Sequence, residues 1–185
     1  MPETETKLEK LAKIIDGQVV SNQAAVQICI KGIVAGFPVK VEAIQANYPF
    51  GVSYFIETSN FSSMSVNESF KLVVMPKYAR GRLSAITRFL FFERRGQNVD
   101  VSALDSAFIF KYDNGFLAKQ FAHCPNVADN IQALEKQTHF NEMVIKSDAG
   151  LYLSQPTPFN VLDLEQCKET FDTLAKLAQV LFESF

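Results

Sequence analysis

The side chains best suited to chemistry in this sequence are one cysteine and two histidines. Cys124 follows His123 directly and precedes Pro125, while His139 lies fifteen positions beyond Cys124. A cysteine nucleophile needs a base within hydrogen-bond reach, which sequence neighbours rarely provide. Folding would therefore have to bring His139 to Cys124, and no family signature surrounds this cysteine. An enzyme built on this pair is the remote alternative, and the sequence favours a small cysteine buried at a helix end.

The sequence contains no spacing typical of a metal or nucleotide site. Cys29, Cys124 and Cys167 are scattered, and no Cys-x-x-Cys, His-x-x-x-His or Glu-x-x-His pattern occurs. The Asp-Asn-Gly turn at residues 113–115 lacks the other ligands of a calcium loop. No Gly-x-Gly-x-x-Gly or Walker-type loop is present. We therefore predict no metal and no cofactor, and we expect a protein that is not an enzyme.

Charge is unevenly distributed along the chain. Residues 1–70 carry five positive and seven negative charges, residues 71–95 seven and one, and residues 96–185 six and twelve. The basic segment holds all five arginines: Arg80, Arg82, Arg88, Arg94 and Arg95. Because a guanidinium binds carboxylate or phosphate through two parallel hydrogen bonds, this cluster is the candidate site for an anionic ligand, an acidic partner or a lipid headgroup. The alternative is that the segment packs against the acidic second half of the molecule.

Composition limits the class of protein. The 185 residues are 48% apolar, which is enough for a core and excludes a disordered chain. Eight glycines and three cysteines exclude collagen-like and disulfide-scaffold chains. The odd cysteine count and the lack of an apolar run after the charged N-terminus predict a cytoplasmic protein. The chain is acidic and contains no motif that reads nucleic acid, so we expect no nucleic-acid partner.

The first half of the chain is predicted to form one helix followed by strands. Thr6 and Glu9 have capping-box spacing, and a short amphipathic helix should end near Gly17. From residue 19 to residue 75, apolar and polar residues alternate, which predicts an antiparallel meander with one solvent-facing side. Residues 83–92 fit a helix or a buried strand equally well.

The second half mixes strands with helices. It predicts a strand at 107–112, helices near 116–121 and 127–134, a hairpin over 143–154 and a final helix over 163–183. We therefore expect an α+β domain spanning residues 1–185, an antiparallel sheet covered by the C-terminal helix and shorter helices. The alternative is two subdomains, 1–99 and 100–185.

The final helix carries apolar residues at spacings of three and four. This seam is formed by Leu164, Cys167, Phe171, Leu174, Ala178, Leu181 and Phe185. A seam of that length is the lower limit for a coiled coil and would allow a homodimer through the C-terminal helix. Further apolar residues beside the seam favour packing against the sheet.

The order helix, hairpin, long helix over residues 125–185 resembles the second half of secretion-chaperone-like α+β domains. The chain is also similar to bacterial domains in which a phenylalanine-rich strand, here Phe108-Ile109-Phe110, precedes helices and a hairpin. Such chaperones are small, acidic, enzymatically inert and often dimeric. The resemblance therefore implies a binding or adaptor module for a protein partner. A binding protein for an anionic or lipid-like ligand, held by the Arg80–Arg95 cluster or in an apolar cavity, is the alternative.

Overall fold

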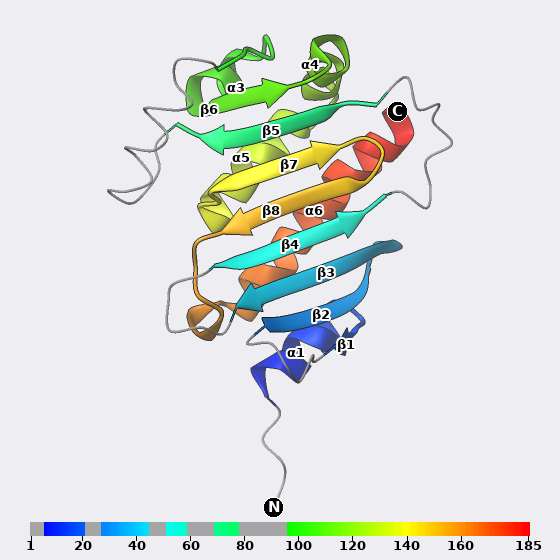
Figure 1. Ribbon diagram of the computed structural model, residues 1–185, viewed down its shortest axis with the longest axis vertical. Coiled ribbons are helices and arrows are strands. Elements are labelled where there is room, and N and C mark those ends of the chain that lie inside the picture. The colour runs from blue at the N-terminus through cyan, green and yellow to red at the C-terminus, as the bar shows by residue number, and fades with distance from the viewer. Residues whose placement is uncertain (1–5, 21–26, 45–50, 59–68, 78–95) are drawn as a thin grey trace, which may run out of the picture.

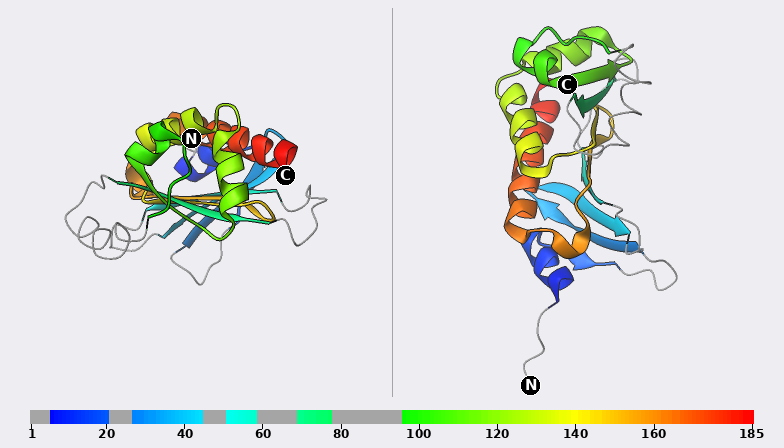
Figure 2. Two further views of the ribbon diagram at one scale, coloured as in Figure 1. Left: turned by 90° about the horizontal axis from the view of Figure 1, so that it is seen from above. Right: turned by 90° about the vertical axis from the view of Figure 1, so that its left-hand side faces the viewer.

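A computed structural model describes residues 6–20, 27–44, 51–58, 69–77 and 96–185. Its strands form one antiparallel sheet, and its helices lie together on one face of that sheet (Figures 1 and 2). The strands are β1 Gln18–Val19, β2 Gln27–Val34, β3 Phe37–Ile44, β4 Val52–Glu57, β5 Lys71–Pro76, β6 Phe108–Tyr112, β7 Glu142–Lys146 and β8 Gly150–Gln155. The helices are α1 Lys7–Ile14, α3 Ser102–Ala107, α4 Gly115–His123, α5 Val127–Thr138, the 3₁₀ turn η3 Phe159–Val161 and α6 Leu164–Ser184. The predicted α+β class is confirmed.

The sheet has the strand order β1-β2-β3-β4-β8-β7-β5-β6. The predicted meander is present from β1 to β4, whereas β5 joins the sheet on the far side of the β7–β8 hairpin. Strands from both sides of residue 99 therefore share one sheet. Between β2 and β3 the two-residue turn at Ala35 and Gly36 has positive φ at both positions, the geometry whose twist matches a hairpin.

Local capping agrees with the sequence at both ends of the chain. The Thr6 hydroxyl accepts a hydrogen bond from the Glu9 amide, and the Glu9 carboxylate accepts one from the Thr6 amide, which forms the predicted capping box of α1. Asp163 accepts hydrogen bonds from the amides of Glu165 and Gln166 at the start of α6. These contacts satisfy amides that the first helical turn leaves without partners.

Large rings fill the space between the sheet and the helices. The rings of Tyr54 and Phe171 meet edge to face at 5.3 Å between centroids, and both side chains are fully buried. Phe70, Phe121 and Phe185 form a second group, with centroids 5.2 to 6.3 Å apart. Because these rings interdigitate, the helix-covered face of the sheet is a packed core. Among the described residues, no helix is both long and apolar enough to cross a membrane.

Candidate functional site

The predicted arginine site, residues 80–95, lies outside the described residues, as does the segment 83–92. Two lysines shortly before this segment, Lys71 and Lys77, belong to the described residues. The Lys77 ammonium donates to the backbone oxygen of Asp105 at 2.6 Å, whereas Lys71 is exposed on β5. The arginine cluster therefore stays a prediction. Of the two flanking lysines, Lys71 lines the hollow on the sheet.

The structure does not bring Cys124 and His139 together. Cys124 ends α4 and His139 ends α5, so the twelve residues of α5 separate them, a length of about 18 Å. The Cys124 thiol lies 3.4 Å from the Gln120 carbonyl oxygen, and the His139 ring lies 3.5 Å from the Glu135 carboxylate. A cysteine nucleophile with His139 as its base is therefore incompatible with this arrangement. Within the described ranges, no three histidine, cysteine or acidic side chains cluster as metal ligands would.

The apolar seam of α6 is used inside the chain. From Cys167 to Leu181 its members are buried in the core, and Leu164 and Phe185 pack against that core. Exposed positions on the other side of the helix are mostly charged, among them Lys168, Asp172 and Lys176. The helix thus covers the sheet, as its broad stripe predicted, and a homodimer through it would have to use another surface of the helix.

The described helices lie on one face of the sheet, and we call the opposite face the open face (Figure 2). An ordered row of side chains lies on the open face. Cross-strand partners in the register share a face, so the pairings can be followed from strand to strand. One such row runs through Lys31, Lys40, Phe55, Tyr152, Val144, Val73 and Lys111. We call it the central row. Its middle is apolar and half-buried, and lysines stand at both ends.

Contacts within the central row hold two aromatic rings in place. The rings of Phe55 and Tyr152 lie 4.9 Å apart, and the Lys40 ammonium sits 4.2 Å from the Phe55 centroid. Lys40 also forms an ion pair with Glu42 at 3.0 Å. The Tyr152 hydroxyl lies 3.4 Å from that of Ser53. These contacts make a pre-ordered aromatic platform on the open face, since Phe55 has partners on β3 and β8 and Tyr152 has two partners on β4.

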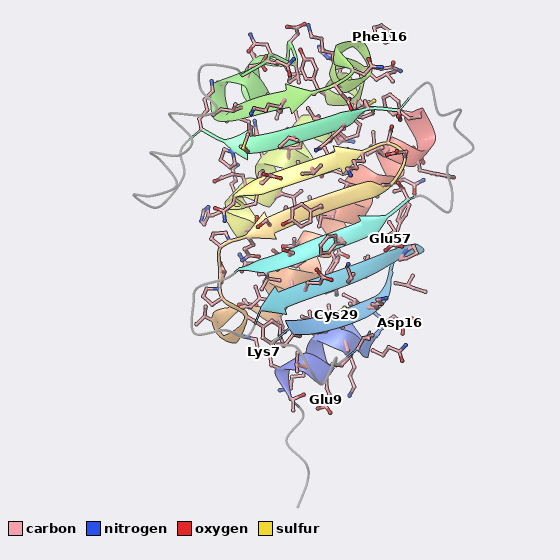
Figure 3. The ribbon with its side chains drawn as sticks, viewed as in Figure 1. Lys7, Glu9, Asp16, Cys29, Glu57 and Phe116 are labelled. Atoms are coloured by element: carbon pink, nitrogen blue, oxygen red, sulfur yellow. The ribbon has the colours of Figure 1, made fainter. Side chains whose placement is uncertain are left out.

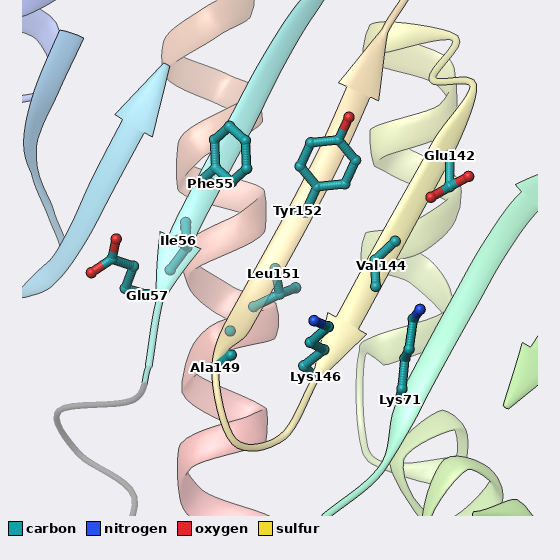
Figure 4. A pocket seen from close by; sticks show the side chains of 11 residues that line it. Phe55, Ile56, Glu57, Lys71, Glu142, Val144, Lys146, Ala149, Leu151 and Tyr152 are labelled. Carbon is teal, nitrogen blue, oxygen red and sulfur yellow. The ribbon is translucent and has the colours of Figure 1, made fainter. Parts of the chain in front are cut away.

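A hollow of about 390 Å³ lies beside this platform (Figure 4). Its lining includes Phe55, Tyr152 and Val144 of the central row, and Lys71 and Lys146. In the next row of the sheet, Glu57, Gly150, Lys146 and Lys71 are successive register partners. Gly150 lies between Glu57 and Lys146 in this row and lines the hollow without a side chain of its own.

Lys71 and Lys146 are direct cross-strand neighbours at one end of the hollow (Figure 4). Both side chains are exposed. Within the described ranges, neither ammonium group has an ion pair or a hydrogen-bond partner. Like charges directly opposite each other destabilise a sheet, so the two lysines repel each other, although the Asp113 carboxylate, which accepts a hydrogen bond from the Lys71 backbone amide at 2.7 Å, lies close to one of them.

Sequence reasoning missed this site. The alternation predicted for residues 19–75 is consistent with Phe55 lying on the face opposite Tyr54, and the same pattern holds for Tyr152 on β8. The pairing of β4 with β8, and of β7 with β5, carries no local signal, so the meeting of Phe55 with Tyr152 and of Lys71 with Lys146 could not be predicted. The segment with the five arginines, residues 80–95, was predicted as the site because those residues are contiguous in the sequence.

Comparison with protein-family models, curated proteins and solved structures finds no match to this chain. The observed order α5, β7–β8 hairpin, α6 is the helix–hairpin–helix order predicted for residues 125–185. The resemblance to secretion-chaperone-like domains therefore stays a resemblance of element order. What the protein does has to be argued from the geometry of the open face.

Proposed function

We propose that the protein is a non-catalytic binding module that holds a protein partner against the open face of its sheet. The observation that carries the proposal is the central row, in which Phe55, Tyr152 and Val144 lie side by side over three strands. Half-buried apolar side chains in a contiguous group are typical of interaction surfaces, especially where polar residues surround them. No described helix or strand covers this part of the face.

The extent of the uncovered surface supports a protein partner. Further along the sheet, Met75 and Ile109 also face away from the helices, yet they are only 3% and 4% exposed. The uncovered apolar surface is thus centred on β4, β8 and β7. It is broad and shallow, with one hollow beside it, and the helix-covered side is filled by aromatic rings. This favours a macromolecular surface over an enclosed cavity for a lipid-like ligand.

The arginine cluster at residues 80–95 remains the second candidate surface, for an anionic ligand or an acidic partner. It is a prediction from charge and residue type alone. A homodimer and a cytoplasmic location are likewise predictions of the sequence, and neither is needed for the proposal.

Site-specific photo-crosslinking tests the proposed function. A photoreactive phenylalanine analogue is placed at Tyr152, and in a matched protein at Phe116, an equally aromatic position at the α4 end of the molecule that is 78% exposed (Figure 3). In the cells that produce the protein, we expect one discrete protein adduct from position 152 and none from position 116. A Val144→Asp substitution should remove that adduct, because it places a charge in the apolar row. Equal adducts from both positions, or an adduct indifferent to Val144→Asp, would refute the proposal.

A further inference from the structure

We propose that the hollow beside the central row anchors an extended acidic segment of the partner. Lys71 and Lys146 would hold a carboxylate of that segment, and a neighbouring apolar side chain would rest on Phe55 and Tyr152. This inference rests on the proposed function, because it names the chemistry by which the open face recognises its protein partner.

The charges around the hollow select a negative group. Lys71 and Lys146 stand on adjacent strands in direct register, where side chains come within about 5 Å at Cβ. Glu142 lies four residues before Lys146 on β7, about 13 Å away at the opposite end of the hollow. The Glu57 carboxylate points toward β3 and away from both lysines (Figure 4). The nearest described carboxylate is that of Asp113, which accepts hydrogen bonds from the backbone amides of Lys71 and Asn114 at the β6 side of Lys71. It has no printed contact with Lys146, so a carboxylate bound between the two ammonium groups would relieve their repulsion.

The dimensions of the hollow suit single side chains. Its volume of about 390 Å³ lies at the lower end of the range for ligand pockets. Gly150 lines the hollow without a side chain. Val144 separates the lysine pair from Glu142 at the far end (Figure 4). One carboxylate side chain and one apolar neighbour would fill this space.

The spacing of the two subsites fits an extended chain. Lys146 and Val144 lie two residues apart on β7 and point to the same face, about 7 Å apart along the strand. A segment laid along the strands also repeats its side-chain direction every two residues. An acidic residue followed two positions later by an aromatic residue would therefore meet the lysine pair and the apolar row together. Beyond the hollow the row continues to Lys40 on one side and Val73 on the other, which offers a longer segment further contacts.

Fluorescence anisotropy with defined peptides tests this inference on the full chain. The probe is a labelled peptide of sequence ESFSE, with KSFSK and ESASE as controls for charge and for the ring. We expect ESFSE to bind, KSFSK not to bind, and ESASE to bind more weakly. Lys71→Glu and Lys146→Glu should each weaken ESFSE binding at least about tenfold, because charge reversal repels the carboxylate. Lys176→Glu, on the exposed face of α6, is the matched control and should leave binding unchanged.

Several outcomes would overturn the inference. They are no binding of ESFSE to the unaltered protein, equal binding of KSFSK, and ESFSE binding that Lys146→Glu does not weaken. Displacement of ESFSE by inorganic phosphate at equal concentration would assign the lysine pair to a small anion instead. The crosslink from position 152 separates the two proposals. If it persists in the Lys71→Glu/Lys146→Glu protein, the binding module stands and only the acidic anchor is refuted.

Discussion

The two faces of the sheet use the same strands for different purposes. On β4, Tyr54 points to the helices and is fully buried, with its hydroxyl donating to Gln155 at 2.9 Å. Its neighbour Phe55 points the other way and is half-buried, in contact with Tyr152 and Lys40. Stability should therefore depend on one face and recognition on the other. Alternation along a strand is enough to separate the two roles, since adjacent residues never share a face.

Matched phenylalanine truncations test this separation with the largest expected effect. Phe171→Ala removes a buried ring that contacts Tyr54, and we expect it to lower the free energy of unfolding by about 3–5 kcal/mol. Phe55→Ala removes a ring from the open face and should cost about 1 kcal/mol or less. Urea denaturation followed by circular dichroism measures both. Similar losses of unfolding free energy in the two variants would mean that the open face contributes as much to stability as the core does.

Alkaline pH should destabilise the protein through its helix-covered core, where Cys167 and Tyr54 are buried. Burial raises the pKa of the Cys167 thiol to about 11, an effect that its contact with Tyr54 partly opposes, and burial also raises the pKa of Tyr54. The unfolded thiol ionises near pH 9, while the folded thiol stays neutral until about pH 11. The unfolded state thus binds fewer protons in this window, so the stabilisation that comes from the neutral Cys167 thiol is complete below pH 9 and is lost, by about 2–3 kcal/mol, as the pH rises toward 11.

Cys167→Ala isolates this contribution. We expect the variant to be less stable than the unaltered protein at neutral pH, but to lose less of its stability between pH 9 and pH 11. Urea denaturation across that range measures the difference. If the two proteins lose stability in parallel, the thiol is not the group that titrates.

Gly150 joins the two faces, because it lines the hollow and also pairs β8 with β4 and β7. Its φ is +124°, and a Cβ there would lie 2.0 Å from the Ile56 carbonyl oxygen. We expect Gly150→Ala to destabilise the protein by about 2–3 kcal/mol through strain and collision. Gly36→Ala is the control, since Gly36 has φ +85° and open space around it, and should cost about 1 kcal/mol. Thermal unfolding measures the loss of stability in both variants. Equal losses would show that the end of the β7–β8 hairpin adjusts to a side chain at position 150.

Much of the fold could be predicted because its signals are local. The capping box at Thr6 and Glu9, the alternation in β3 and β4, and the three-four spacing of α6 are all readable within one element. The short helix α3, Ser102–Ala107, was missed because it is too brief for a period and its Val101 cap has no side-chain hydrogen bond. The insertion of the β7–β8 hairpin between β4 and β5 is a long-range event for which these segments carry no local signal.

The candidate site was harder to predict from the sequence for the same reason, because it too depends on long-range strand pairing. Phe55, Lys71, Lys146 and Tyr152 come from four strands, and only the strand order brings them together. The predicted site was a run of arginines that is contiguous in the sequence and lies outside the described residues. Contiguity is what a sequence displays best, whereas a surface on a sheet is assembled across strands.

The variant with the smallest expected effect on stability, Lys146→Glu, tests most directly whether a residue of the open face serves stability or recognition. Lys146→Glu converts the repulsive cross-strand pair with Lys71 into an attractive one, so the free energy of unfolding should rise by about 0.2–1 kcal/mol at low salt. The gain should shrink as salt is added, because both side chains are exposed. Lys176→Glu, which has no like-charged cross-strand neighbour, should show no such gain. The same Lys146→Glu protein should bind the acidic peptide more weakly. Since a merely damaged fold cannot become more stable, a rise in stability with a loss of binding would assign Lys146 to recognition, whereas a fall in both would place it in the structural framework.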